Sequence, residues 1–470
     1  MAQASSLLKR QHHTQPSCIR PLATNVGPRK HTFDPMPIHH PLRLGLVVPP
    51  ISGHLHPALS VARELADRGH HLTCFGLPDA AAKVGAAGID FHPISAERFP
   101  LGTVPAWMKI QGEKAGIAAM HWILRCLQHE NLAYLDDLPA ALRASQTDAL
   151  LVDQIAYGAA SVAQHLQLPY ITLCNALPVH ADPSVPPFAT TWRPLPPFLE
   201  ALRSRLGSLA FRPLFMSHLR PINQRRRMWD LDPLQPESLA GSSLAVLSQQ
   251  PPGFEFPRRR LPPHFHLTGP WIRADSRSAE PFPFERLDGR PLIYASLGTL
   301  QNRMESVFRT IAAACEGLDA QLVIALGARD ATGLPNLPGN PVVVPFAPQL
   351  RLLRLASLVI THAGLNTALE ALAHGVPMVA IPIANDQPGV AARIRAAGVG
   401  EFLSLPSLTV AGLRIRIEKV LHGSSYRQAA ARFAEQIAQS SGTALAANLI
   451  EAKLPRQVAE LPPSEQTFVP

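Results

Sequence analysis

Short apolar runs alternate along this chain with amphipathic segments, a pattern typical of buried parallel strands joined by helices. A strand, loop, helix and second strand are predicted at 148–173, and a C-terminal helix at 428–439. The other predicted strands are 42–48, 70–76, 292–299, 321–326, 342–345, 357–361 and 376–381. The segment 292–299 is a strand that runs into a loop of small residues. This alternation predicts an α/β fold built from doubly wound parallel sheets.

Two predicted helices follow strands at places where a ligand would bind. The first helix is expected to start at or near Pro57, because proline suits a first-turn position, and to end at Gly69. The loop 49–54 ahead of it lies at the carboxyl edge of the first strand, where such folds bind ligands. The second helix follows Gly364, has one apolar stripe, and ends at Gly375.

The length of 470 residues predicts two domains with sizeable cores. The first forty residues are rich in His, Pro, Ser and basic residues and contain no apolar secretory core, so we expect them to be disordered. Met36 leaves a later natural start as an alternative. The predicted division is a disordered extension at 1–40, a first domain at 41–270, a linker at 271–290, a second domain at 291–454 and a disordered tail at 455–470.

Composition excludes several classes of protein. Apolar residues make up 46% of the chain, but no run of about 18 of them could span a bilayer. The net charge of +9 suits an anionic substrate, an anionic lipid or nucleic acid, yet no helix-turn-helix or RNA-binding pattern supports the last of these. Five dispersed cysteines predict reduced thiols and a cytoplasmic location. No metal-ligand spacing, P-loop or G-x-S-x-G motif occurs, so no metal centre, kinase or serine hydrolase is predicted.

The first turn of the helix after Gly364 has the residues of a nucleotide site. Asn366, Thr367 and Glu370 lie on one face at a spacing of three and four. Free N–H groups and the positive end of the helix dipole favour a phosphate there. A carboxylate one turn further in would repel phosphate but accept hydrogen bonds from sugar hydroxyls. The alternative is an ordinary strand-helix unit whose turn contains polar residues by chance.

His54 and Asp153 are predicted at the same edge of the first sheet. His54 lies in the first loop, and Asp153 ends a later strand. A carboxylate behind an imidazole holds one tautomer and stabilises the protonated form, as a general base requires. The alternatives are a solvent-exposed loop histidine and a helix-capping or turn aspartate. A metal site at His54 and His56 would lack further ligands, so we do not predict one.

The segment 198–229 leaves two interpretations open. It contains seven arginines, one acidic residue, and leucines at 199, 202, 206 and 209 in near-helical spacing. Such a basic amphipathic helix can lie on an anionic bilayer surface. It can equally be a helix whose leucines face the core and whose basic side is solvated.

The segment 346–387 resembles the nucleotide-sugar signature of the UDP-sugar glycosyltransferases that make plant, antibiotic and carotenoid glycosides. The family motif H-x-G-x-N-(S/T)-x-x-E is matched by His362, Gly364, Asn366, Thr367 and Glu370, its opening W-A-P-Q by Ala347, Pro348 and Gln349, and its closing (D/E)-Q by Asp386 and Gln387. Phe346 replaces the stacking tryptophan, and Leu365 replaces an aromatic residue common in plant members. The first loop, P-P-x-x-G-H-x-x-P, resembles the family's catalytic loop.

The resemblance implies the GT-B arrangement, two Rossmann-like domains facing a central cleft, and assigns roles to individual residues. His54 would be the catalytic base and Asp153 its partner. In the donor site, Phe346 would stack on uracil, the main chain near Gln349 would read its edge, and Glu370 would hold the ribose. The diphosphate would be held by His362, Asn366, Thr367 and Ser296, the last of these in an S-x-G-T loop with Gly298 and Thr299. Asp386 and Gln387 would bind the hexose.

The same resemblance implies an inverting, metal-independent transfer from a UDP-sugar, with glucose as the default hexose and no other cofactor. The acceptor is expected to be a lipophilic small molecule such as a carotenoid, since in the family the middle region forms the acceptor pocket and here it contains apolar residues. The loop 176–188 also resembles that of the bacterial zeaxanthin glucosyltransferases, and a macrolide or phenolic acceptor is the alternative. Peripheral contact with the cytoplasmic membrane face is also an open interpretation. Two further alternatives are a UDP-sugar epimerase of the same fold and a non-catalytic nucleotide-sugar-binding protein.

Overall fold

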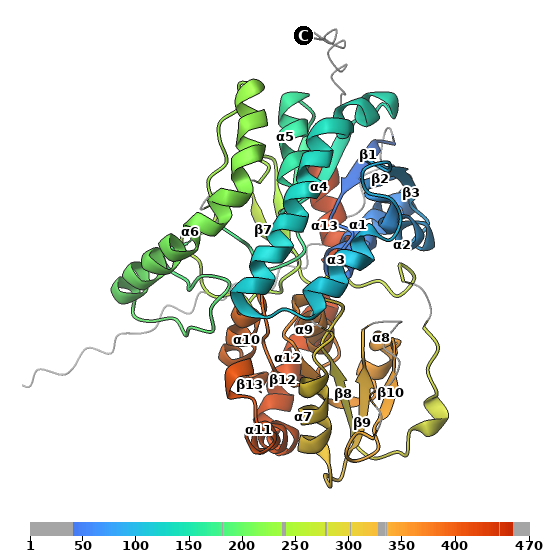
Figure 1. Cartoon of the computed structure of the whole chain (residues 1–470), viewed down its shortest axis with the longest axis vertical. Helices are drawn as coiled ribbons and strands as arrows, with labels where there is room; N and C mark the ends of the chain where they lie inside the picture. Colours follow the sequence, from blue (N-terminus) through green and yellow to red (C-terminus); the bar gives the residue numbers. More distant parts are fainter. Residues whose placement is uncertain are drawn as a thin grey trace, which may run out of the picture. The chain divides into compact units, whose positions relative to one another are not determined.

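The structure is a computed structural model that describes residues 41–454 except 181, 237–240, 278–279, 301, 328–333, 335 and 441. The predicted extension at 1–40 and the predicted tail at 455–470 lie outside the described residues. In the described part, two parallel sheets and their covering helices form the fold (Figure 1).

The first sheet has seven strands in the order β3-β2-β1-β4-β5-β6-β7, and all neighbouring strands pair in parallel. This order reverses direction at β1 and β4, which makes their carboxyl ends the switch point where doubly wound folds bind ligands. Its strands are β1 (Arg43–Val47), β2 (His71–Gly76), β3 (Asp90–Pro93), β4 (Ala149–Asp153), β5 (Tyr170–Cys174), β6 (Val246–Ser248) and β7 (Phe265–Leu267). Its helices are α1 (Ser52–Asp67), α2 (Ala81–Ala86), α3 (Thr103–Gly112), α4 (Gly116–Ala144), α5 (Tyr157–His165) and α6 (Pro197–Met228).

The second sheet repeats this topology with six strands in the order β10-β9-β8-β11-β12-β13, again all parallel. Its strands are β8 (Leu292–Ser296), β9 (Gln321–Ala325), β10 (Val342–Val344), β11 (Ala356–Thr361), β12 (Met378–Ala380) and β13 (Gly400–Phe402). The helices that follow in the chain are α7 (Glu305–Cys315), α8 (Gln349–Leu353), α9 (Leu365–Ala373), α10 (Gln387–Ala396), α11 (Val410–His422), α12 (Ser424–Ser440) and α13 (Gly442–Lys453). The short 3-10 helices are η1 (Pro78–Ala80), η2 (Phe284–Arg286) and η3 (Leu405–Ser407).

Each sheet has a hydrophobic core on both faces. Successive strand residues point to opposite faces, so β1 contributes Leu44 and Leu46 to one core and Val47 to the other. In β8, Tyr294 belongs to one core of the second sheet and Ile293 to the other. Burial on both faces explains why these strands are continuous apolar runs rather than alternating ones.

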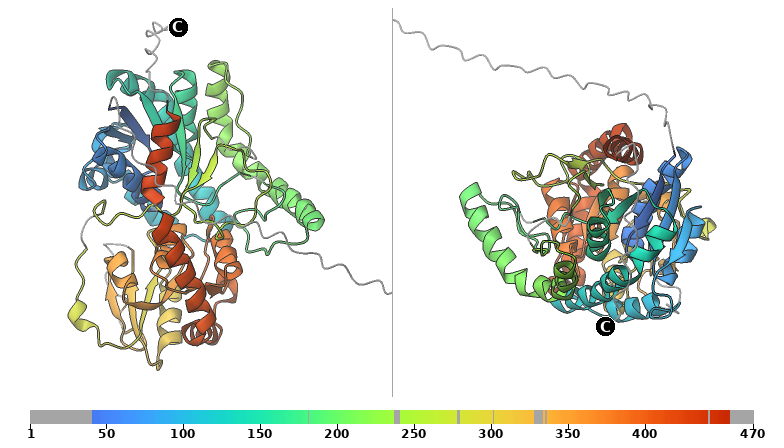
Figure 2. Two further views of the ribbon diagram at one scale, coloured as in Figure 1. Left: turned by 180° about the vertical axis from the view of Figure 1, so that it is seen from behind. Right: turned by 90° about the horizontal axis from the view of Figure 1, so that it is seen from above.

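The last helix returns to the first sheet. Ala446, Ala447 and Ile450 of α13 are buried in the same core as α1, and Figure 2 shows α13 next to elements of the N-terminal half. Arg68 and His70 both bond the Glu451 carboxylate, at 2.8 and 3.2 Å. The C-terminal helix predicted at 428–439 is confirmed as part of α12, and a further helix, α13, follows it.

The start of α1 differs from the prediction. The helix begins at Ser52, five residues before Pro57, which therefore lies inside it. Proline has no N–H to donate to the carbonyl four residues earlier, which here is that of Gly53. The side-chain amide of Asn366 donates to the Gly53 oxygen instead. A partner 313 residues away in sequence thus supplies the hydrogen bond that the Gly53 carbonyl would otherwise lack. Because the helix begins at Ser52, His54 lies on its first turn rather than in a loop.

Helix α6 is present over almost the whole predicted segment and bends along its length, with Pro213 and Pro221 in its interior (Figures 1 and 2). Its four leucines do not face the core: those at 199, 202, 206 and 209 are all exposed. The core-facing interpretation of these leucines is therefore wrong, and only the second half of the helix, through Leu219 and Ile222, packs into a core. No helix in the described part of the chain is long and apolar enough to cross a membrane.

Candidate active site

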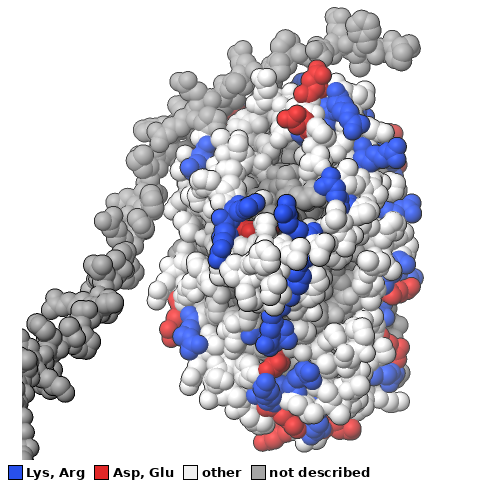
Figure 3. Space-filling model, turned by 90° about the vertical axis from the view of Figure 1, so that its left-hand side faces the viewer, with Lys and Arg blue, Asp and Glu red and all other residues white. Residues whose placement is uncertain are grey.

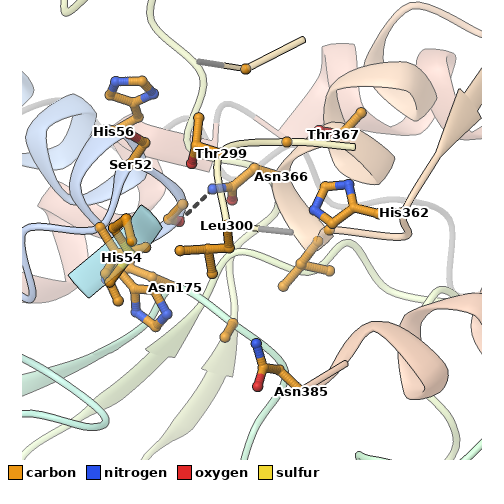
Figure 4. A pocket seen from close by; sticks show the side chains of 18 of the residues that line it. Ser52, His54, His56, Asn175, Thr299, Leu300, His362, Asn366, Thr367 and Asn385 are labelled. Atoms are coloured by element: carbon orange, nitrogen blue, oxygen red, sulfur yellow. Dashed lines mark hydrogen bonds between the residues drawn. The ribbon is translucent and has the colours of Figure 1, made fainter. Parts of the chain in front are cut away.

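A cavity of about 1230 Å³ lies where the carboxyl ends of β1, β4, β8 and β11 open (Figure 4). Nearly every residue predicted for the site lines it. These are His54, Ser296, Gly298, Thr299, Phe346, Ala347, Gln349, His362, Gly364, Asn366, Thr367, Glu370, Asp386 and Gln387. Asp153 is the exception, because it lies fully buried behind His54.

His54 and Asp153 form a hydrogen-bonded pair. The Nδ1 atom of His54 is 2.8 Å from Oδ2 of Asp153. The first turn of α1 places the imidazole, and the end of the adjacent strand β4 places the carboxylate. The carboxylate is itself fixed by the side-chain amide of Asn175 at 2.6 Å and by the N–H of Ile155 at 2.9 Å. With Nδ1 held in this way, Nε2 is the nitrogen left to accept a proton from the cavity.

The charges around His54 set its protonation. Burial by itself lowers the pKa of His54, but the charge and hydrogen bond of Asp153 outweigh it, and Asp386 and Glu130 act in the same direction. The net effect is a pKa above the ordinary histidine value. Such an imidazole is a stronger base than a free histidine, as proton abstraction from a hydroxyl requires.

We expect kcat/KM to decrease at pH values below a midpoint, because His54 must be neutral to accept a proton. That midpoint should lie above about 6.5, the ordinary pKa of histidine. Below its raised pKa the imidazole is protonated, and activity drops about tenfold per pH unit. In Asp153→Asn the midpoint should move to lower pH, since the charge that raises the pKa of His54 is gone and burial remains. Measuring kcat/KM against pH for both proteins checks this, and an identical midpoint would contradict it.

His362 lies between two glycines. A Cβ atom on Gly298 would lie 2.5 Å from Cε1 of His362, and one on Gly364 would lie 2.5 Å from its Nε2. Only glycine at both positions lets the S-x-G-T loop and the start of α9 close on the ring. Burial lowers the pKa of His362 to about 4, so the ring is neutral at physiological pH. Among the described residues, its buried Nδ1 atom has no hydrogen-bond partner of ordinary geometry.

Asn366 connects the start of α9 to the first sheet. Its amide nitrogen donates to the Gly53 carbonyl (dashed in Figure 4), and its oxygen accepts from Nε2 of Gln249 at 2.7 Å. Gln249 also donates to the Asn175 carbonyl, next to the His54 partner network. The side chain is thus engaged with the protein, and its predicted contact with a diphosphate stays a prediction. Thr367 lines the cavity beside it.

Glu370 is buried in a chain of side-chain contacts. Arg277 donates to its Oε1 atom, and Nε2 of Gln349 donates to Oε2 at 2.6 Å. Tyr294 in turn donates to Oε1 of Gln349 at 3.1 Å. Burial opposes ionisation of Glu370, but the charge of Arg277 and these hydrogen bonds lower its pKa overall. The site therefore holds an ionised carboxylate with lone pairs left for further donors.

Two other predicted residues lie at the start of α10. Asp386 accepts from the Leu177 N–H at 3.2 Å, and burial raises its pKa. The side-chain oxygen of Gln387 accepts from the N–H groups of Ile383 and Ala384, both at 2.9 Å. Both side chains line the cavity, and their predicted contacts with a hexose stay predictions.

Several residues of the cavity were not predicted from the sequence. Arg277 lies in the predicted linker. Asn175 and Gln249 come directly after strands β5 and β6 of the first sheet. Asn385 has a positive φ of 57° and a buried side-chain oxygen with no hydrogen-bond partner among the residues that the structure describes. Polar residues at strand ends are a usable signal for Asn175 and Gln249, whereas Arg277 has none. Within the described residues, no cluster of His, Cys, Asp or Glu could hold a metal ion.

The cavity wall on the His54 side is largely apolar. It is formed by the first loop, by α3, α4 and α5, by the loop after β5, and by α6. Its apolar members include Ile51, Val104, Met108, Met120, Ile123, Leu124, Leu127, Tyr157, Phe188 and Phe215. The polar residues near the start of α9 and this apolar wall thus line one cavity together with His54, as an enzyme that joins a polar to a lipophilic substrate would require.

Comparison with known proteins agrees with this geometry. Residues 118–437 match the family model described as UDP-glucoronosyl and UDP-glucosyl transferase. The zeaxanthin glucosyltransferase of Pantoea ananas is 31% identical over 414 residues, covering 86% of this chain and 94% of that protein. The zeaxanthin glucosyltransferase of Pseudescherichia vulneris is 33% identical over 422 residues, covering 86% and 96%. The solved structure of the glycotransferase of kitacinnamycin has a TM-score of 0.70 at 25% identity, covering 89% of this chain and 100% of that one. The family and the GT-B fold predicted from the sequence are confirmed.

Proposed function

Because this chain belongs to the UDP-glucoronosyl and UDP-glucosyl transferase family, it is a glycosyltransferase, and we propose that it transfers glucose from UDP-glucose to a hydroxyl of a lipophilic alcohol. The observation on which this depends most is the His54–Asp153 pair, at 2.8 Å, in a cavity that also contains the start of α9. A base for a hydroxyl and a site for a diphosphate are the two parts that such a transfer needs.

The donor assignment follows the polar half of the cavity. We place the diphosphate at the N-terminal end of α9, where free N–H groups and the helix dipole favour negative charge. His362 and Thr367 lie beside this end, and the Glu370 carboxylate one turn further in would accept from the ribose hydroxyls. Preorganised donors at this position would stabilise the charge that develops on the leaving diphosphate.

In the proposed reaction, Nε2 of His54 removes the proton of the acceptor hydroxyl while that oxygen attacks the anomeric carbon. The Asp153 carboxylate stabilises the imidazolium as it forms. The bond to the diphosphate breaks on the opposite face, so an α-linked donor gives a β-glycoside. Proton, nucleophile and leaving group are thus each matched by a separate part of the cavity.

The apolar wall and the relatives support a carotenoid-like acceptor. The wall beside His54 offers aliphatic and aromatic contacts to a long hydrocarbon, and the two curated relatives described above are named for zeaxanthin. A cavity of about 1230 Å³ would also admit a macrolide or a phenolic natural product, which is the second acceptor class to test.

A screen of UDP-sugars against hydrophobic alcohols tests the proposal. We expect UDP release with UDP-glucose and a carotenoid or related lipid alcohol, and a β-glucoside product by the proton coupling at its anomeric carbon. UDP-glucose incubated alone should give neither UDP nor an epimer, which separates a transferase from an epimerase. Turnover only with macrolides or phenols would show that the acceptor belongs to one of those classes and not to the lipid alcohols. An α-glucoside product would contradict the inverting reaction.

A further inference from the structure

The outer half of α6 presents an apolar stripe to solvent. Phe198, Leu202, Leu206 and Leu209 are between 53% and 81% exposed. Their spacing of three and four residues places them on one face of the helix. Large apolar side chains exposed singly are ordinary, but a row of four on one helix face marks an interaction surface.

The opposite face of the helix holds it in this orientation. Glu200, Ser204 and Gly207 are buried against the loop that precedes the helix. Glu200 accepts from the Leu195 N–H at 2.7 Å, and the Ser204 hydroxyl donates to the Val185 carbonyl at 2.8 Å. Because the packed face is polar and hydrogen-bonded, the leucines cannot rotate inward without breaking these contacts. The stripe is therefore a stable feature of the surface.

The charge around the stripe is positive. The only acidic residue of α6, Glu200, is buried and pairs with Arg203. Arg205 is exposed in the outer half beside the stripe, and Arg220 and Arg227 are exposed further along the same helix, beyond Pro213. Figure 3 views the side from which α6 projects and shows Lys and Arg gathered around an uncharged area, with little Asp or Glu near its middle. An apolar row flanked by arginines is complementary to anionic phospholipids.

The same helix continues into the wall of the cavity. Beyond Pro213, which lies where the outer and inner parts of the helix meet, Phe215 and His218 line the cavity near the apolar wall. Docking through the stripe would therefore place the helix that supplies part of the cavity wall at a bilayer, the source of a lipophilic acceptor, with Phe215 and His218 on the helix face opposite to the stripe.

We propose that the outer half of α6 docks on the surface of an anionic phospholipid bilayer, with its apolar stripe at the level of the headgroups and its arginines over the lipid phosphates. A second copy of this chain is a poorer partner, because a symmetric contact would place the arginines of the two copies against each other. The consequence for acceptor supply rests on the proposed function, whereas the docking itself does not.

Sedimentation with vesicles tests the docking directly. The full chain should bind vesicles of equimolar phosphatidylcholine and phosphatidylglycerol, and bind pure phosphatidylcholine vesicles at least about tenfold less. Leu202→Ser with Leu206→Ser and Leu209→Ser should lower the partition coefficient by about tenfold or more. The matched control is Leu355→Ser with Ile415→Ser, which changes equally exposed apolar residues on other elements and should bind as wild type does.

A charge variant separates the electrostatic contribution. Arg205→Gln with Arg220→Gln should weaken binding about fivefold per arginine, and the difference should shrink at high salt. Arg427→Gln with Arg432→Gln, two exposed arginines of α12, is the control. Circular dichroism checks that each variant is folded.

Three outcomes decide the proposal. Equal vesicle binding by wild type and the triple serine variant would overturn it. So would sedimentation velocity without lipid that shows a wild-type dimer and a monomeric triple variant, because the stripe would then bind a second copy. Vesicle binding that follows the variants as expected supports docking even if no alcohol in the vesicles is glucosylated, a result that would count against the proposed function alone.

Discussion

Replacing His54 with alanine is expected to lower kcat by ~10²–10⁴-fold, the contribution typical of a general base. The reason is that His54 combines a raised pKa, a carboxylate at 2.8 Å and a position facing the cavity. His56 lines the same cavity, but burial and the charges of Arg277 and Lys83 lower its pKa to about 3, which makes it a poor substitute base. Steady-state kinetics with saturating acceptor and UDP-sugar provides the measurement.

The affinity for UDP should change little in this variant, because the proposed donor contacts come from α9 and the second sheet. Calorimetric titration with UDP measures that affinity separately from turnover. His121→Ala is the matched control: it removes an exposed histidine of α4 that does not line the cavity, and it should leave kcat unchanged. If His54→Ala turned over at nearly the wild-type rate, the base would have to be another group.

The sheets could be predicted from the sequence because each buried strand is a continuous apolar run with a turn after it. Two predicted strands, 357–361 and 321–326, differ from the observed β11 and β9 by one residue at one end. The strand predicted at 376–381 is observed as the three-residue strand β12, because strand pairing ends where the neighbouring strand β13 ends. Such boundaries depend on neighbouring strands rather than on the residues of the strand itself.

The first turn of α1 shows what the sequence could not predict. A rule about proline placed the helix start near Pro57, and the rule fails here because Asn366 supplies the hydrogen bond that the proline cannot. The ion pair between Arg277 and Glu370 is hidden for the same reason, since its members are 93 residues apart. Local patterns identify which residues can do chemistry, whereas their partners depend on the tertiary fold.

The leucines of α6 show a related limit. Their periodicity correctly places them on one helix face, but it does not tell what that face meets. In the sequence, a core contact and an exposed surface were equally consistent with the pattern. The hydrogen bonds of Glu200 and Ser204 on the opposite face decide the matter, and neither could be read from apolar spacing.

Replacing Glu370 with alanine is expected to lower kcat/KM for UDP-glucose by about 10²-fold or more, mainly by raising the donor KM. An ionised carboxylate that accepts from two ribose hydroxyls makes two charge-assisted hydrogen bonds, each contributing ~1.5–3 kcal/mol. The carboxylate is ionised because Arg277 lowers its pKa despite burial, and two of its lone pairs remain after Arg277 and Gln349 are bound. Initial rates at varied UDP-glucose measure the change.

The ribose assignment can be separated from a purely structural role of the ion pair. Arg277→Met removes the cation that keeps the buried Glu370 carboxylate ionised, so it should lower the melting temperature and also raise the donor KM, though less than Glu370→Ala does, because a protonated carboxyl can still accept from a hydroxyl. A donor that lacks the ribose 2′-hydroxyl gives a sharper test. The wild type should use it about tenfold less well or worse than UDP-glucose, because a carboxylate acceptor is left unmatched, whereas Glu370→Ala should use both donors equally. If the variant kept the full discrimination of the wild type, the ribose would be held by another residue, since only a group that contacts the missing hydroxyl can sense its loss.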